Sequence, residues 1–167
     1  MKTNKMMLME QNRKKLSVQS MYFNRYLLVR YASALFFFTN LYWFLSLLMS
    51  GSSLFVIPLI LIITLIASVV EQVKLYSAHT NNARYTKYSF ITLLLTNVWL
   101  IISISFLSMF HQLYPFLTNQ MKYRVFILIV LVLGIVLSAI ILRRLKKIKY
   151  NEDKHFERIK QYENIIK

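Results

Sequence analysis

Between Arg30 and Glu71 the chain carries no charged side chain at all. A single helix over this stretch, rising about 1.5 Å per residue, would be about 60 Å long, which is twice the ~30 Å hydrocarbon core of a bilayer. The small polar residues at 50–53 interrupt the run near its middle, as a turn does. The stretch therefore predicts two membrane-spanning helices, over residues 31–49 and 54–70, joined by a tight turn.

Two further apolar runs follow, over residues 89–110 and 125–142. A polar stretch at 111–115, which contains a proline, closes the first of them, and a pair of arginines ends the second. All residues from 125 to 142 are large or small apolar residues except Gly134 and Ser138, whereas a soluble helix needs a polar face. We therefore predict an all-α fold, an integral membrane four-helix bundle that forms one transmembrane domain over residues 31–142.

The distribution of basic residues predicts the orientation of the chain. All of the 21 Lys and Arg residues except Lys122 and Arg124 fall in the N-terminal arm (1–30), in the loop between the second and third spans, or in the C-terminal tail (143–167). Because cytoplasmic flanks collect Lys and Arg, both termini are expected in the cytoplasm. The formal net charge of +15 favours an anionic lipid bilayer as partner. Nucleic acid is excluded as a partner, since the basic residues border apolar runs rather than forming a polar surface.

The C-terminal tail is predicted to be a basic, amphipathic cytoplasmic helix, with apolar residues recurring at helical spacing among mixed charges. Two interpretations of its apolar stripe stay open: it rests on headgroups or on the protein's own loops, or it docks a partner helix. The tail begins with a basic cluster that marks the end of the last span and is expected to contact lipid headgroups. Its members are Arg143, Arg144, Lys146, Lys147 and Lys149.

One ionisable residue lies where a bilayer makes charge costly, and such a residue is a candidate functional group. This residue is Glu71, at the inner end of the second span, and three polar residues share its helix face: Thr64, Ser68 and Gln72. The third span adds polar positions at Thr96 and Asn97. The set could line an ion or proton path; alternatively, Glu71 pairs at the interface or inside the bundle, and the other side chains hydrogen-bond between helices.

Several chemistries are excluded by the sequence. Because the chain has no cysteine and only two glycines, it offers neither a thiol nucleophile nor a phosphate-cradling loop. Its three histidines lie in separate segments without metal-ligand spacing. We therefore predict no enzymatic activity, no catalytic or metal site and no cofactor.

These features favour a small non-enzymatic protein of the cell membrane, acting as an accessory subunit, regulator or immunity-type protein through helix–helix and tail contacts. The alternative is a homo-oligomeric transporter or channel that uses Glu71 and the polar faces of the second and third spans. Frequent Lys, Asn, Ile, Tyr and Phe indicate an AT-rich genome. In this style the chain resembles small accessory four-span proteins of low-GC bacteria, so a bacterial plasma membrane is the expected location.

Overall fold

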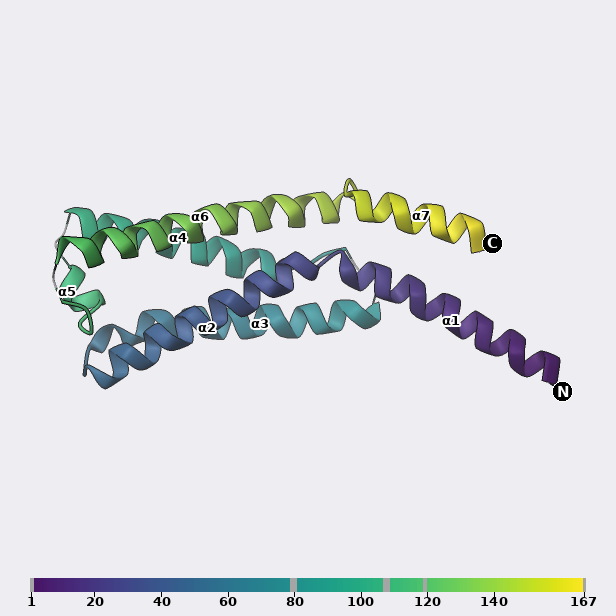
Figure 1. Cartoon of the computed structure of the whole chain (residues 1–167), viewed down its shortest axis with the longest axis horizontal. Coiled ribbons are helices and arrows are strands. Elements are labelled where there is room, and N and C mark those ends of the chain that lie inside the picture. Colours follow the sequence, from purple (N-terminus) through teal and green to yellow (C-terminus); the bar gives the residue numbers. More distant parts are fainter. Residues whose placement is uncertain (1, 79–80, 107–108, 119, 167) are drawn as a thin grey trace.

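The computed structural model describes residues 2–78, 81–106, 109–118 and 120–166 (Figure 1). Over these residues the structure consists of helices and the turns between them, without strands. The elements, in chain order, are α1 (Lys2–Asn24), α2 (Leu27–Met49), the short 3-10 turn η1 (Ser53–Phe55), α3 (Val56–Ala78), α4 (Arg84–Phe106), α5 (Phe110–Leu113), α6 (Met121–Lys149) and α7 (Lys154–Ile166).

Four helical segments are long and apolar enough to cross a membrane, and they are α2, η1 with α3, α4 and α6. This finding confirms the predicted all-helical chain with four candidate spans, and it indicates a multi-pass membrane protein. The helices do not end where the charges begin. For example, α6 continues through its basic cluster to Lys149, because Lys and Arg are good helix formers and no glycine or proline interrupts them.

The four long helices run antiparallel, and both chain termini lie at the same end of the bundle, which we call the terminal end (Figure 1). α2 packs on α3, α3 on α4, and α4 on α6. Figure 1 shows the bundle as two pairs, α2 with α3 and α4 with α6. The core between them is apolar: Phe36 and Phe90 meet edge to face at 6.0 Å between ring centroids, with Leu65 and Leu100 buried nearby in the same cluster.

At the opposite end, which we call the far end, the short helix α5 packs into the bundle. Phe110 and Leu113 are completely buried, and the indole N–H of Trp43 donates to the carbonyl oxygen of Leu113 at 2.9 Å. The Trp43 ring also stacks on Tyr114, with 5.7 Å between centroids. α4 ends at Phe106, earlier than the predicted end of the third span at 110, because residues 110–113 form this separate inward-packed turn.

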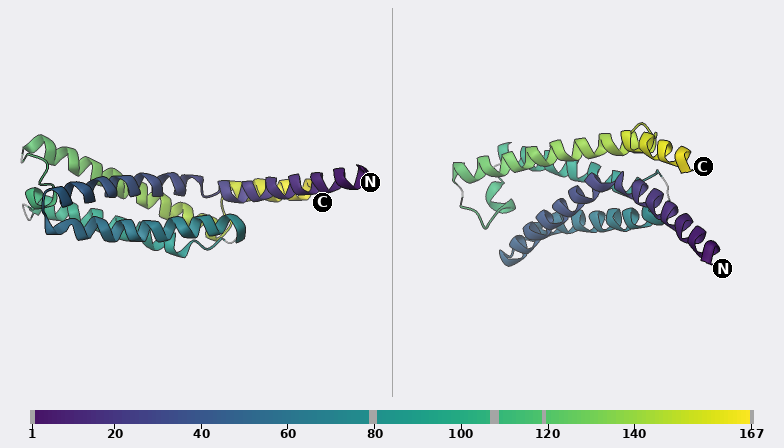
Figure 2. Two further views of the ribbon diagram at one scale, coloured as in Figure 1. Left: turned by 90° about the horizontal axis from the view of Figure 1, so that it is seen from below. Right: turned by 45° about the vertical axis from the view of Figure 1, so that its right-hand side comes forward.

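At the terminal end, α1 and α7 project beyond the four long helices (Figure 2). They pack against each other next to the bundle and diverge toward their free ends. Only a break at Arg25 and Tyr26 separates α1 from α2, so the N-terminal arm is a helix almost continuous with the first span. The fold thus joins a membrane bundle to a pair of polar helices at one end.

Candidate functional site

Glu71, the ionisable residue singled out by the sequence, caps the N-terminus of α4. Its Oε1 accepts the backbone N–H of Tyr85 at 3.0 Å, and its Oε2 accepts the N–H and hydroxyl of Thr86 at 2.7 and 2.8 Å. The first N–H groups of a helix lack partners within the helix and form its positive end, so a carboxylate is well placed there. Among the described residues, no ion pair joins Glu71 to Lys74 or Lys87.

Gln72 and Ser68 extend this cap into a buried polar chain that links three helices. The Gln72 amide donates to the hydroxyl oxygens of Ser33 in α2 and Ser68 in α3, at 3.0 and 2.9 Å. The Ser68 hydroxyl in turn donates to that of Thr86 in α4, at 3.1 Å. All four side chains are buried, and the Gln72 side-chain oxygen has no hydrogen-bond partner among the residues that the structure describes. In an apolar bundle such bonds hold neighbouring helices together.

The side chains of the other predicted polar residues, Thr64, Thr96 and Asn97, are not part of this buried polar chain of hydrogen bonds among the described residues. The Thr64 hydroxyl donates within its own helix, to Leu61, while its carbonyl oxygen accepts the Ser89 hydroxyl at 2.6 Å. Asn97 faces α6 instead, with its amide nitrogen 2.7 Å from where a Cβ on Gly134 would stand. Thr96 is half-buried beside Asn97. Among the described residues, Thr64, Thr96 and Asn97 therefore lie outside the hydrogen-bonded series formed by Gln72, Ser68 and Thr86.

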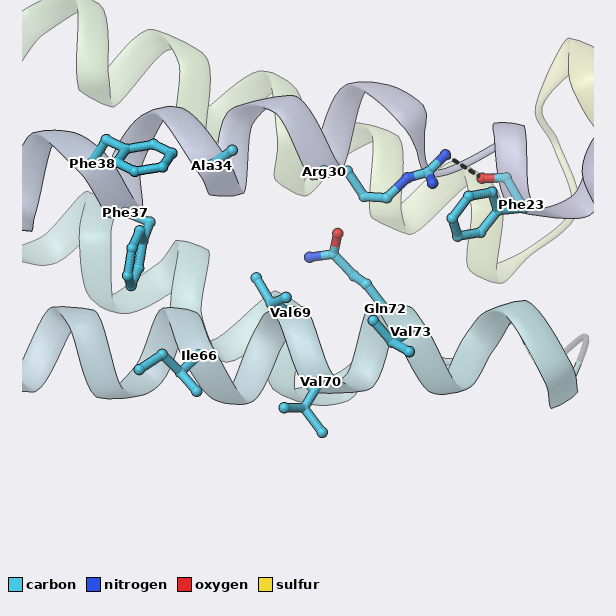
Figure 3. Close-up of a pocket in the computed structure, with 10 residues that line it drawn as sticks. All are labelled: Phe23, Arg30, Ala34, Phe37, Phe38, Ile66, Val69, Val70, Gln72 and Val73. Carbon is cyan, nitrogen blue, oxygen red and sulfur yellow. Dashed lines mark hydrogen bonds between the residues drawn. The ribbon is translucent and has the colours of Figure 1, made fainter.

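A groove beside Gln72 runs between α2 and α3 and has a volume of about 410 Å³ (Figure 3). Phe37 and Phe38 on α2 and the aliphatic residues of α3 make its walls apolar. Arg30 lies at the end nearest α1, where its Nη2 donates to the carbonyl oxygen of Phe23 at 3.1 Å and its guanidinium covers the Phe23 ring at 3.3 Å. The arginine is thus held over the ring and away from the apolar walls.

The most tightly held charged group lies at the terminal end. The Arg25 side chain is completely buried and donates from Nε and Nη2 to the carboxylate of Asp153, the Nε bond being 3.1 Å long. Its Nη1 donates to the side-chain oxygen of Asn81, and Nη2 also donates to the side-chain oxygen of Asn151 and to the carbonyl oxygen of Ile148. This Arg25 junction, defined by these five residues, joins the α1–α2 break, the α3–α4 loop and the α6–α7 turn.

Sequence reasoning missed this junction, although one local signal was present. Arg25 counted only as one of many basic residues, and Asp153 as one of the mixed charges of the tail. Asn151, however, adopts a positive φ of 57° directly after the end of α6, a conformation that Asn tolerates better than most residues. The sequence at 150–153 therefore carried a turn signal, but not the identity of the partner at residue 25.

The predicted lipid-contacting residues lie on the last turns of α6. Arg144 donates from Nη2 to the carbonyl oxygen of Arg25 at 3.4 Å, so it supports the Arg25 junction. The other four are exposed: Arg143, Lys146, Lys147 and Lys149. The described residues contain no group of three or more His, Cys, Asp or Glu side chains that could hold a metal ion.

Comparison of the chain with protein-family models, with curated proteins and with solved structures gives no match. Three features of its own structure therefore bear on function: the Arg25 junction, the Glu71 cap and the exposed basic turns of α6.

Proposed function

We propose that this protein is a non-enzymatic accessory subunit or regulator in the cell membrane, with both termini in the cytoplasm. It would act on a partner membrane protein through the helix pair formed by α1 and α7. The observation that carries the proposal is the Arg25 junction, which fixes the start of this pair to the membrane bundle. A change in the position of the pair would then shift α3, α4 and α6, because the turns at the ends of these helices bind the Arg25 guanidinium.

Side-chain contacts between α1 and α7 support a defined arrangement of the pair. Ile159 of α7 is 1% exposed, and the Arg25 guanidinium lies 5.0 Å from the centre of the Phe156 ring. Farther along, the Tyr22 hydroxyl interacts with the Glu163 carboxylate. Burial and the neighbouring negative charge and hydrogen bond of Glu163 raise the pKa of Tyr22. The apolar stripe of α7 is thus used, at least in part, within the chain itself.

The outer part of α1 supplies the surface that a partner would cover. Large apolar side chains there are exposed, with Met6 at 73% and Met7 at 60%. Flexible methionines suit a surface that must fit another helix, and clustered exposed apolar residues mark interaction sites. Basic residues flank them, so an acidic or amphipathic segment would complement the surface: Lys5, Arg13, Lys14 and Lys15.

The homo-oligomeric transporter or channel is less well supported. Both oxygens of Glu71 already accept hydrogen bonds from α4, so the carboxylate has a structural use that requires no ion. Among the described residues, the Thr64 hydroxyl bonds within its own helix and the Asn97 amide faces Gly134 of α6, so neither side chain extends the polar chain across the bundle.

Purification from the native host tests the proposal. A C-terminally tagged protein carrying a photo-crosslinking amino acid at Met7 would be irradiated in cells, extracted in mild detergent, and analysed for mass and composition. We expect a second protein in stoichiometric amount, cross-linked at Met7. The control places the same cross-linker at Phe106, which is 82% exposed at the far end. Cross-linking of the same partner at both positions would contradict a specific role of α1, and a pure homo-oligomer would overturn the accessory function.

A further inference from the structure

A cavity of about 590 Å³ lies between the start of α4 and the last turns of α6, at the terminal end. Four basic residues line it, two from each helix: Arg84 and Lys87, and Lys146 and Lys149. No acidic side chain is among the lining residues of this part of the described chain. The cavity therefore gathers positive charge from two segments that are far apart in the sequence.

Helical spacing explains why these residues face one another. Leu142, Lys146 and Lys149 follow each other at intervals of four and three, which places them on one face of α6. α4 presents a matching face, because Arg84, Lys87 or Tyr88, and Ile91 recur at the same intervals. Since α4 and α6 pack against each other along the bundle, the two faces meet.

Within the described part of the chain, the four basic side chains of the cavity form no ion pair with an acidic side chain. All four basic side chains are exposed and stand on neighbouring helices, so they repel one another unless an anion lies between them. Glu71 does not fill this role, because it is bound to the backbone of the first turn of α4 and does not line the cavity. The four cations, together with the amide of Asn82, therefore suit a phosphate group.

The cavity also has an apolar side. Ile91 and Leu142 lie one turn or more from the charged residues in the direction of the bundle, and Tyr88 and Tyr150 also line the cavity. A soluble phosphate compound has no apolar part to pack on this side of the cavity. A lipid, in contrast, places an acyl chain there and its headgroup among the cations. We propose that this cavity is a specific binding site for one anionic phospholipid of the leaflet at the terminal end, with its phosphate held by Arg84, Lys87, Lys146 and Lys149.

This site differs from general attraction of the basic tail to a charged surface. Arg143 and Lys147 belong to the same basic cluster of α6, but neither lines the cavity. They provide a matched control, since removing them takes the same amount of charge from the same two turns of helix. A tail that only senses surface charge would respond equally to both pairs of substitutions.

The test measures lipid binding to the purified full-length protein in detergent, where no bilayer surface contributes. Delipidated protein would be titrated with phosphatidylglycerol or with phosphatidylcholine of the same chains, and bound lipid would be counted by native mass spectrometry. We expect one tightly bound phosphatidylglycerol. The double variant Lys146→Gln/Lys149→Gln should weaken its binding about 25-fold, on the basis of about fivefold per lost charge. The control Arg143→Gln/Lys147→Gln should change it by less than about twofold, because those side chains lie outside the cavity.

Three outcomes would overturn the proposal. If both double variants weaken phosphatidylglycerol binding equally, the effect is one of total charge and there is no specific site. If phosphatidylcholine binds as tightly as phosphatidylglycerol, the protein does not recognise the headgroup charge. Competition by free glycerol phosphate at the same concentration as the lipid would show a site for a soluble phosphate instead. Because the substituted side chains are exposed, unchanged helix content and thermal midpoint are expected for both variants, and these measurements verify that each is folded.

Discussion

Replacing Asp153 by alanine is the most direct test of the Arg25 junction. The substitution leaves a guanidinium that is 0% exposed without its counter-charge. Removing one partner of a buried ion pair costs about 3–5 kcal/mol, because the other charge stays buried. Here the oxygens of Asn81, Asn151 and Ile148 continue to accept hydrogen bonds from Arg25. We therefore expect the lower end of that range, a decrease of about 3 kcal/mol in the free energy of unfolding, or about 100-fold in the equilibrium constant.

The assay is reversible unfolding in mixed micelles, extended to a double-mutant cycle. The double variant Arg25→Met/Asp153→Leu should be less destabilised than Arg25→Met or Asp153→Leu alone, since apolar replacement of a whole buried pair is often close to neutral. Because the chain has no cysteine, spin labels can be attached at Lys15→Cys and Lys160→Cys to report the distance between α1 and α7. We expect the distance distribution to broaden in Asp153→Ala.

Glu152→Ala supplies the control, because this neighbouring carboxylate is exposed and should contribute about 0–1 kcal/mol at most. If Asp153→Ala costs no more than Glu152→Ala and leaves the spin-label distances unchanged, the reasoning fails. That result would mean that water or the asparagines around Arg25 replace the carboxylate without loss.

Three further predictions concern the bundle itself. Gly134→Leu should cost about 1–3 kcal/mol by overpacking against Asn97, whereas Gly134→Ala should be nearly neutral because the Asn97 amide can turn away; thermal unfolding in detergent separates the two. Glu71→Gln should remove a charge-assisted cap and destabilise α4 by about 1 kcal/mol, seen as faster hydrogen exchange in its first turn, while solute flux in liposomes stays unchanged. For orientation, a membrane-impermeant maleimide should label Ser53→Cys in intact cells and Lys160→Cys only after permeabilisation, and the reverse pattern would refute cytoplasmic termini.

The four spans could be predicted from the sequence because long charge-free runs have few alternatives to a membrane helix. The ends of the helices could not be predicted in the same way. α3 passes through Glu71 and Lys74 and continues to Ala78, since charge marks the membrane boundary but does not by itself end a helix. The inward fold of α5 depends on the contact between Trp43 and the Leu113 carbonyl, which no local pattern indicates.

The candidate site, too, could be predicted from the sequence only in part. The sequence singled out Glu71 and Gln72 from their position at the inner end of an apolar run, and in the structure both belong to a polar network. The partner of Glu71, however, is the backbone of α4 rather than a lysine, because the N-terminus of that helix, 14 residues further along the chain, offers unsatisfied N–H groups. Arg25 could not be distinguished from Arg13 or Arg30, since its burial results from the packing of three separate turns.

The Arg25 junction and the basic cavity share the same short segments, and this predicts an unequal coupling between them. Asn81 and Ile148 hold Arg25, while their neighbours Asn82 and Lys149 line the cavity. Asp153→Ala should loosen both segments and so weaken phosphatidylglycerol binding about three- to tenfold, although Asp153 lies outside the cavity; this corresponds to about 1 kcal/mol of coupling. Lys87→Gln, by contrast, should leave the spin-label distance between α1 and α7 unchanged, because Lys87 is on α4 and does not contact the junction. If Asp153→Ala disturbs the helix pair without affecting lipid binding, the turns at 81–82 and 148–151 act independently, and the two sites are not linked.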